Sequence, residues 1–303
     1  MIGFSMKRLA ATVALVAQSL AAQSPEQRAV DYLAKETPRW FKENACFSWH
    51  NNGDAARALY TASRRGYSVP QEALADTTQW LRKPLDWDNN HGDPGFSDKK
   101  LARIQFAAAL VEAYESGMIR DHDTVTKAAE SLVSYQEADG SWLVDAGSVG
   151  SPATYGTALA TYMALRTLNA AAGDRVKQVQ TKANAWINKL APRSILEQSV
   201  VLLTSPSPAV ITQLLSAQSS DGGWGPYPTS PAEPFDTAVA LIALQNLKQP
   251  EAVGRGRAFL IAHQEKSGGW PETTRPPGAQ SYAEHISTTA WATIALILTD
   301  SKP

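Results

Sequence analysis

Cysteine is almost absent from this chain of 303 residues: Cys46 is the only one, so an internal disulfide is excluded and stability must come from packing. An excess of one charge is also missing. Lys and Arg number 28 against 29 Asp and Glu, for a formal net charge of -1, which argues against a nucleic-acid partner. No segment keeps the strand-like alternation of polar and apolar residues. What remains possible is a helical, well-packed protein.

Long apolar runs are lacking beyond the first residues. Lys7 and Arg8 precede an apolar run at 9–16, and Ser19-Leu20-Ala21 offers a small-x-small cleavage site. This is the pattern of a secretory signal peptide, so we expect residues 1–22 to be removed and the mature protein to be periplasmic or secreted. No later stretch is long and apolar enough to span a bilayer, so we expect no transmembrane segment in the mature chain.

Apolar residues do recur at helical spacing along almost all of the remaining chain. Ile104, Phe106, Ala107, Leu110 and Val111 are one example. Gly and Pro fall between such runs and break them. We therefore expect an all-α protein with a single domain over 23–303. Its six helix pairs are predicted at 24–66, 70–118, 122–172, 175–204, 208–248 and 251–299.

One short phrase occurs three times: a Gln, five residues and then a Trp, with a Gly two residues before the Trp. The Gly suits a tight turn, and the Trp can cover that turn with its indole N–H satisfied. We interpret the phrases as structural staples; the fourth helix pair lacks one. The copies are Gln136 to Trp142, Gln218 to Trp224 and Gln264 to Trp270, each with a Leu four residues before its Gln.

A helix with the pattern Thr-Ala-x-Ala follows each copy, and we expect it to open at Thr157, Thr237 and Thr289. Repeated helix pairs cannot bury their apolar faces alone, so they stack. The Ala-rich inner helices allow close packing, which favours closure of the pairs into a ring; an open solenoid is the alternative. In a ring, the residues just before each Thr (Gly156, Asp236 and Thr288) would lie at equivalent positions, at the end of the ring where these inner helices begin.

The three phrases resemble the QW repeats of the terpenoid cyclase and prenyltransferase superfamily, especially squalene–hopene cyclases. The resemblance is strong over about residues 132–298 and weak over the N-terminal third. It implies an α/α toroid, a barrel of helical hairpins. It does not by itself imply cyclisation, because one fold hosts many functions. Squalene–hopene cyclases also place their cavity between two such domains, whereas this chain has one.

Class II cyclases of that superfamily carry a DxDD acid motif before the same Thr-Ala step. The matching stretch here runs from Glu233 to Asp236, and only its last Asp matches. Phe235 stands where the protonating Asp would be, and a Phe cannot donate a proton. Asp236 or Glu233 could replace it if an apolar cavity raised its pKa. The alternative for Asp236 is a helix N-cap.

Four aromatic residues are candidates to line an axial cavity: Tyr155, Tyr162, Phe235 and Trp291. Aromatic faces can stabilise a cationic centre in a bound substrate. His285, beside Tyr282 and Glu284, lies before the last Thr-Ala pattern and would reach the same mouth as Asp236. It is a third candidate acid, and simple capping is the alternative.

Residues 45–52 resemble the C-x-x-C-H-N segment of some bacterial cyclase-like proteins, which is a c-type haem attachment signature. Trp49 replaces the second Cys. We expect no haem here, and interpret Cys46 as buried and His50 as a capping or partly exposed residue.

Metal sites are weakly indicated. Prenyltransferase β-subunits bind zinc through Asp, Cys and His, but Cys46 has no matching Asp context and the five His show no ligand spacing. The acidic loop at 86–93 resembles a calcium loop only in part, because its Gly comes one residue late and no Glu follows at the twelfth place. We expect a solvated turn there and no metal or cofactor.

Three functions remain open. The first is a secreted toroid that binds an apolar (isoprenoid or lipid) ligand or a protein partner, without standard class II activity. The second is a single-domain terpene cyclase or isomerase that uses Asp236 or Glu233 as its acid. The third is a polysaccharide lyase or hydrolase, which would need paired carboxylates. The depth of the axial cavity, its apolar or polar lining, and whether Asp236 points inward would separate them.

Overall fold

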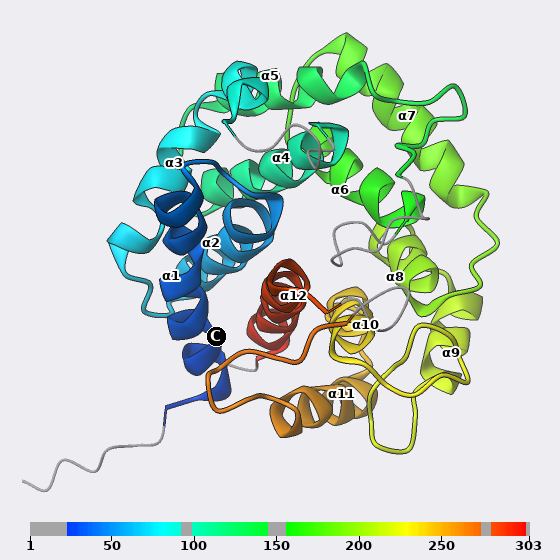
Figure 1. Cartoon of the computed structure of the whole chain (residues 1–303). Coiled ribbons are helices and arrows are strands. Elements are labelled where there is room, and N and C mark those ends of the chain that lie inside the picture. Colours follow the sequence, from blue (N-terminus) through cyan, green and yellow to red (C-terminus); the bar gives the residue numbers. More distant parts are fainter. Residues whose placement is uncertain (1–22, 92–98, 145–155, 274–279, 301–303) are drawn as a thin grey trace, which may run out of the picture.

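The computed structural model describes residues 23–91, 99–144, 156–273 and 280–300, and these form helices and loops without a strand. The expected signal peptide and Tyr155 lie outside these ranges. Helices alternate along the chain between an outer and an inner layer (Figure 1). The outer helices are α1 (Pro25–Asn44), α3 (Ala75–Leu81), α5 (His122–Val133), α7 (Asp174–Asn188), α9 (Pro208–Ser216) and α11 (Pro250–Ala262).

The inner layer forms a closed ring. Its first member is a π-helix, η1 (Trp49–Ala55), that continues into α2 (Ala56–Arg64); the others are α4 (Lys99–Glu115), α6 (Thr157–Asn169), α8 (Ile195–Thr204), α10 (Pro234–Leu244) and α12 (Tyr282–Thr299). Each contacts the next, and α12 contacts η1 and α2. Two short 3-10 helices, η2 (Gln71–Ala73) and η3 (Pro84–Asn89), flank α3. The expected all-α toroid and its six helix pairs are therefore confirmed, and the open solenoid was the wrong alternative.

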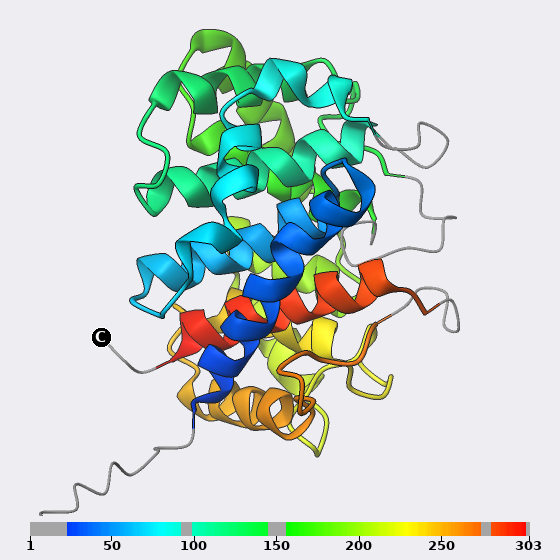
Figure 2. The same cartoon turned by 60° about the vertical axis from the view of Figure 1, so that its left-hand side comes forward.

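The inner helices begin at one end of the toroid, which we call the mouth. Figure 2 shows the N-terminal ends of α4 and α12 on one side of the molecule and the C-terminal end of α12 on the other. Inner helices are buried almost all round: every residue of α10 from Phe235 to Leu244 is buried. Outer helices bury one stripe, such as Val176, Val179, Ala183 and Ile187 of α7. This difference explains the many Ala residues of the inner layer.

Each Gln–Trp phrase makes the same set of hydrogen bonds. The indole N–H of Trp142, Trp224 and Trp270 donates to the carbonyl of Leu132, Leu214 and Leu260, at 3.0, 2.7 and 2.7 Å. These three Trp side chains are fully buried. The interpretation as structural staples is confirmed, and the Leu before each Gln is the hydrogen-bond acceptor.

The Gln side chains join neighbouring outer helices. The amides of Gln136, Gln218 and Gln264 donate to the carbonyls of Val179, Ala252 and Pro25, each at 2.9 Å. The first phrase thus joins α5 to α7, the second α9 to α11, and the third α11 to α1. Gly268 has φ +101°, and a Cβ there would lie 2.4 Å from the carbonyl oxygen of Arg28. Only Gly allows the third loop to approach α1 so closely.

The predicted register of the Thr-Ala step was wrong for the first copy. The backbone N–H of Trp142 donates to the hydroxyl of Thr161, just as Trp224 donates to Thr237 and Trp270 to Thr289. Thr157 lies one helical turn before the equivalent position. Consequently Ala160, rather than Gly156, corresponds to Asp236 and Thr288. Only α6 begins at its predicted Thr; α10 and α12 begin earlier.

Candidate functional site

The centre of the toroid contains a buried arginine. Arg57 of α2 is 4% exposed, and its guanidinium carbon lies 4.1 Å from the ring centre of Trp291 on α12. Its Nη1 lies 3.1 Å from the sulfur of Met163 on α6. Because α6 and α12 stand on opposite sides of the ring, Arg57 occupies the space between them.

Asp54 accompanies this arginine. Its Oδ1 lies 3.3 Å from Nη2 of Arg57, and the carboxyl is fully buried. Burial raises the pKa of Asp54 to about 6, although Arg57 and the hydroxyl of Ser287 on α12 oppose the shift. Burial also lowers the pKa of the Arg57 guanidinium, and Asp54 and Glu112 oppose that change. The pair is therefore held in a low-dielectric environment.

Several buried polar atoms around this pair have no hydrogen-bond partner among the described residues. We call Asp54, Arg57, Ser287 and Trp291 the axial cluster; Arg57 Nε and Trp291 Nε1 have no partner among the described residues, and the Ser287 hydroxyl interacts with the Asp54 carboxyl. The side-chain amides of Gln105 on α4 and Gln198 on α8 also contain unpartnered atoms. Most buried polar atoms in proteins are hydrogen-bonded to protein or to ordered water, so a group of such exceptions marks a place that water, an ion or a ligand can fill.

Two of the predicted aromatic residues do meet. The rings of Phe235 on α10 and Trp291 lie edge to face, with centres 5.7 Å apart. Tyr162 on α6 lies near enough that Arg166 and Arg57 oppose the rise of its pKa caused by burial. Sequence reasoning missed Arg57 and Asp54. The signal was present in the sequence. Arg57 lies within the otherwise apolar stretch from Ala55 to Leu59, and Asp54 directly precedes it, whereas charged residues are rare on a buried helix.

The candidate acids of α10 have different environments. Asp236 is fully buried as the third residue of the helix, while the partly buried Glu233 is its N-cap residue. Glu233 makes no side-chain capping bond, and its backbone N–H donates to the carbonyl of Trp224 at 2.9 Å. The alternative of Asp236 as the N-cap residue was therefore wrong. Proton donation by Asp236 or Glu233 stays a prediction.

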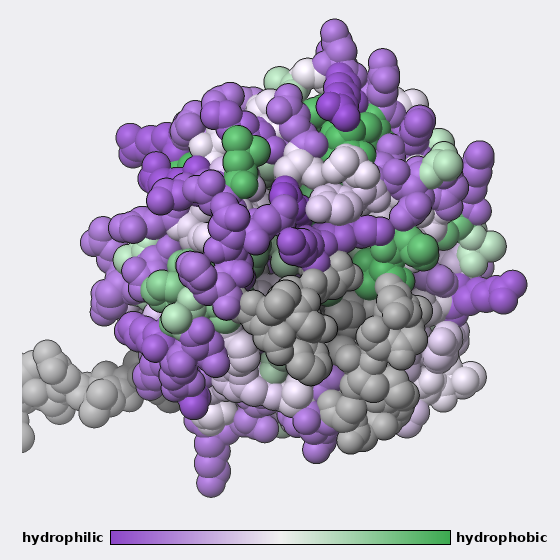
Figure 3. Space-filling model, turned by 45° about the horizontal axis from the view of Figure 1, so that its top comes forward, coloured by the Kyte–Doolittle hydropathy of each residue, from purple (hydrophilic) through white to green (hydrophobic). Residues whose placement is uncertain are grey.

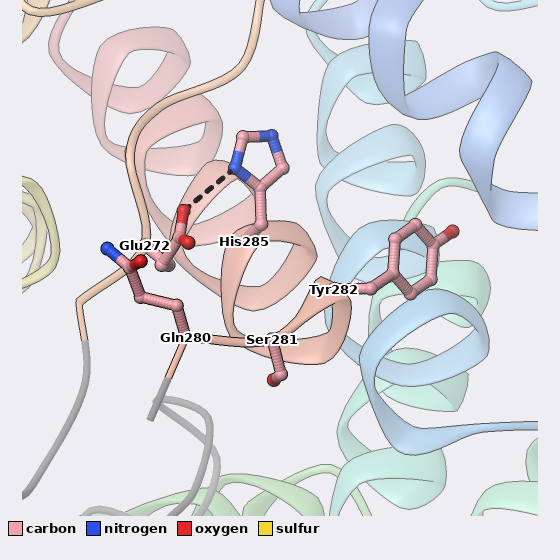
Figure 4. Close-up of a pocket in the computed structure, with 5 residues that line it drawn as sticks. All are labelled: Glu272, Gln280, Ser281, Tyr282 and His285. Carbon is pink, nitrogen blue, oxygen red and sulfur yellow. Dashed lines mark ion pairs between the residues drawn. The ribbon is translucent and has the colours of Figure 1, made fainter. Parts of the chain in front are cut away.

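A polar pocket lies at the mouth, beside the start of α12 (Figure 4). Its volume is about 310 Å³, and it is lined by Glu272, Gln280, Ser281, Tyr282 and His285. The Nδ1 atom of His285 lies 3.4 Å from Oε2 of Glu272, and Figure 4 shows Tyr282 directed away from this pair. His285 lies at the mouth as predicted, and the residues that line its pocket all carry a polar group.

Glu284 lies one residue before His285 and is 1% exposed. Its carboxyl group interacts with the side chain and the backbone of Ser281, the N-cap residue of α12. Burial raises the pKa of Glu284, and the charge of Glu272 adds to the rise, while contacts with Ser281 oppose it. A carboxyl in this state favours its protonated form more than a carboxyl in water does.

His50 of η1 is enclosed by aromatic rings. The ring centres of Trp40, Tyr282 and Trp49 lie 4.7, 5.9 and 6.3 Å from its own. Both ring nitrogens are buried without partners among the described residues, and burial lowers the pKa of His50 to about 3. The capping role expected for His50 was wrong. Cys46 is buried as expected and accepts a hydrogen bond from the Trp40 indole at 3.4 Å.

His50 should make the protein sensitive to acid. Its pKa is about 3 in the folded state against 6.5 for an ordinary His, so below pH 6.5 the unfolded chain binds a proton that the folded chain does not. Stability should therefore fall by about 1.4 kcal/mol per pH unit as pH drops from 6.5. We expect this slope in the difference between wild type and His50→Phe, measured by urea unfolding from pH 7 to 4.5.

The exposed His91 provides the control for this measurement. His91→Phe should keep the pH dependence of the wild type, because the His91 side chain is not buried by folding. Equal slopes for wild type and His50→Phe would contradict the buried, neutral state of His50.

The other metal and cofactor predictions remain predictions. Within the described ranges, no group of three or more His, Cys, Asp or Glu residues is arranged to hold a metal ion. The absence of haem at Cys46 and His50 also stays a prediction. In the acidic loop, Asp88 pairs with Arg103 at 2.5 Å, and the amide of Asn90 bonds the backbone of Phe47. These two side chains therefore serve tertiary structure, so the expected solvated turn is only partly right.

Among the described helices, none is both long and apolar enough to cross a bilayer. The face in Figure 3 is mostly hydrophilic, with separate hydrophobic patches. Leu85, Leu143 and Tyr227 are more than half exposed.

Comparisons with known proteins bear on the fold. No protein-family profile and no curated protein matches the sequence. A wild-type glycosidase structure aligns with a TM-score of 0.59 and 11% identity, covering 91% of this chain and 98% of that one. The type II terpene cyclase MstE from Scytonema aligns with a TM-score of 0.56 and 12% identity, covering 90% and 96%. A protein from Actinoplanes gives 0.55 and 14%, covering 91% and 98%. At such low identities these similarities show one thing, that the chain has the all-helical toroid fold of these proteins.

Proposed function

We propose that this protein binds an amphiphilic small molecule, with an isoprenoid or other apolar body, along the axis of the toroid. The observation that carries the proposal is the axial cluster: polar atoms without partners beside the rings of Phe235 and Trp291. Small-molecule sites commonly combine mostly apolar walls with a few convergent polar groups. A polar group on the ligand would supply the missing hydrogen bonds.

Energetics support this assignment. A buried polar atom left without a partner costs about 1–3 kcal/mol. Two such atoms on one axis therefore destabilise the empty protein and favour a molecule that can pair with them. Their positions on α2 and α12 mean that a bound ligand would contact more than one inner helix.

The structural neighbours are consistent with this ligand class. One MstE variant was solved in complex with its substrate geranylgeranyl dihydroxybenzoate, and aligns here with a TM-score of 0.53. That molecule joins an isoprenoid chain to a polar ring. Because Phe235 stands at the place of the class II acid, we propose binding without standard class II cyclisation. A cyclase or isomerase that uses Asp236 or Glu233 is the alternative, and turnover of the ligand would favour it.

Export is part of the proposal. A signal peptide over residues 1–22 would place the mature toroid in the periplasm or outside the cell. A protein partner is the other proposed occupant. The separate hydrophobic patches in Figure 3 give less support to it than the axial cluster gives to a small molecule.

Binding can be tested with geranylgeraniol as the probe. We expect saturable binding by isothermal titration calorimetry, with one site per chain, and an increase in Tm on adding the probe. Ser287→Ala should weaken affinity about 3- to 10-fold, since one hydrogen bond is lost. The same change should lower the stability of the empty protein by only about 1 kcal/mol, the usual cost of one hydrogen bond, because the Ser287 hydroxyl interacts with the Asp54 carboxyl.

Ser199 supplies the matched control. It is a buried Ser on α8 whose hydroxyl donates to the carbonyl of Ile195 in its own helix at 2.8 Å. Ser199→Ala should leave affinity for the probe unchanged. If wild type binds no geranylgeraniol, or if the two Ser variants lose affinity equally, the proposed axial site is wrong.

A further inference from the structure

Two atoms of the axial cluster without partners among the described residues are hydrogen-bond donors. They are the Nε–H of Arg57 and the indole N–H of Trp291, in side chains that are 4% and 2% exposed. Neither a guanidinium nor an indole N–H can accept a hydrogen bond. A ligand that satisfies them must therefore present acceptor atoms to both.

The position of Arg57 disfavours a cationic group on the ligand. Its guanidinium carbon lies 4.1 Å from the ring centre of Trp291, so it already covers part of that ring. An aromatic face is otherwise a favourable place for a cation. With the guanidinium there, a ligand cation would meet like charge in a buried site of low dielectric constant. The polar group of the ligand is therefore neutral or negative.

The next charged side chains along α2 and α6 balance charges on α4. Arg64 of α2 and Arg166 of α6 each pair with both Glu112 and Glu115 of α4, at N–O distances from 2.5 to 3.2 Å. Two positive and two negative groups leave no net charge. Arg57 and its partner Asp54 are therefore the charges that a ligand at the axial cluster would meet.

Asp54 satisfies Arg57 only in part. Among the described residues, their contact joins one atom to one atom, Oδ1 to Nη2 at 3.3 Å, and leaves the Nε–H free. A carboxylate and a guanidinium can form two parallel hydrogen bonds instead. Burial also raises the pKa of Asp54 to about 6, so this carboxyl takes up a proton more readily than an ordinary Asp does. With Asp54 protonated, the pair has one positive charge for a ligand to balance.

We infer that the ligand of the proposed axial site is an isoprenoid acid, whose single carboxylate accepts hydrogen bonds from the Arg57 Nε–H and the Trp291 indole N–H. The inferred ligand class depends on the axial site under Proposed function and narrows its ligand. Each carboxylate oxygen can accept more than one hydrogen bond, so the group can satisfy both donors. The apolar chain packs beside the ring of Phe235, whose centre lies 5.7 Å from that of Trp291.

The test compares three probes that share one isoprenoid chain: geranylgeranoic acid, geranylgeraniol and geranylgeranyl diphosphate. Each is titrated into the mature full-length protein at pH 6 by calorimetry. The acid should bind about 10-fold more tightly than the alcohol, because hydrogen bonds to an ionised acceptor are about twice as strong as neutral ones. The diphosphate should bind more weakly than the acid, because its additional charge would be buried without a partner.

Two variants connect this preference to the axial cluster. Asp54→Asn removes the carboxylate that competes for Arg57, so affinity for the acid should rise about 10-fold while affinity for the alcohol changes about 2-fold or less. Trp291→Phe keeps a ring but removes the indole donor, and should reduce the preference for the acid about 3-fold or more. Trp186→Phe is the matched control: the Trp186 indole N–H bonds the exposed Asp139, so the preference should stay that of wild type.

The outcomes separate this inference from the proposed function. Binding of the acid by wild type no tighter than that of geranylgeraniol would overturn the inference and leave the axial site intact, as would tightest binding of the diphosphate. A preference for the acid that both Asp54→Asn and Trp291→Phe leave unchanged would also overturn it. Absence of binding by all three probes would refute the axial site itself. If Asp54→Asn does not fold, the wild-type comparison and Trp291→Phe still decide.

Discussion

Replacement of Trp270 by Ala is expected to lower the free energy of unfolding by about 3–5 kcal/mol, the usual cost of removing a large, well-packed aromatic side chain. The Trp270 side chain is fully buried, and its indole N–H donates to the carbonyl of Leu260 at 2.7 Å. Its backbone N–H donates to Thr289 of α12 at 3.0 Å. The loss should appear as a lower midpoint in urea unfolding with an unchanged m-value.

Trp186 on α7 is a suitable control, because it is half-buried and its indole N–H bonds the exposed Asp139 at 3.1 Å. Trp186→Ala should cost about 1 kcal/mol or less. The stability lost in Trp270→Phe should lie between these two values, since Phe keeps most of the ring area but leaves the Leu260 carbonyl without its hydrogen-bond donor. Equal losses for Trp270→Ala and Trp186→Ala would refute the staple role.

Replacement of Arg57 by Met should be similarly costly, by about 3–5 kcal/mol at pH 7, because it leaves the Asp54 carboxylate buried without its counter-charge. Asp54→Asn should cost a similar amount by leaving the guanidinium unpaired. The double variant Arg57→Met with Asp54→Asn should lose clearly less than the sum, since no uncompensated charge remains. Urea unfolding of the four proteins gives the coupling energy directly.

The stability lost in Arg57→Met should also depend on pH in a defined direction. The raised pKa of Asp54 means that its stabilising contribution is complete below the ordinary value of 3.8 and is lost as pH rises through about 6. Arg57 opposes that rise in pKa. When Arg57 is removed, the pKa of Asp54 rises further, and more stability is lost at neutral pH. The deficit of Arg57→Met should therefore shrink at pH 4. Arg39→Met is the control: Arg39 pairs with Glu36 and Glu43 on the surface, where solvent screens the charges, so its loss should leave stability nearly unchanged at both pH values. Additive single losses would contradict a buried ion pair.

The helical layers could be predicted from sequence because they depend on periodicity and local chemistry. Helical spacing of apolar residues and breakers between the runs placed all six pairs. The repeated phrase predicted a covered turn, and its Trp and Gly have those roles. The register error at Thr157 arose because Thr161 and Thr157 differ by one helical turn, and both precede Ala-containing runs. Only the hydrogen bond from Trp142 distinguishes them.

The candidate sites were predicted less well, because they depend on contacts distant in sequence. Phe235 and Trp291 were placed near the axis by the repeat, and their ring contact agrees with that placement. The pairing of Arg57 with Trp291 joins α2 to α12, and nothing in either local segment indicates it. His50 was expected to cap a helix, but three aromatic rings from separate positions bury it.

The bond from Gln264 to the Pro25 carbonyl spans 239 residues, from the first helix to the loop before the last. Such long-range contacts slow folding, because the chain loses the entropy of loop closure before the contacts that stabilise the closed loop have formed. During synthesis α1 therefore emerges with its closing partners still absent, and its buried stripe stays exposed until the final hairpin arrives. Export of the chain in an unfolded state would postpone ring closure until all of its members are present together.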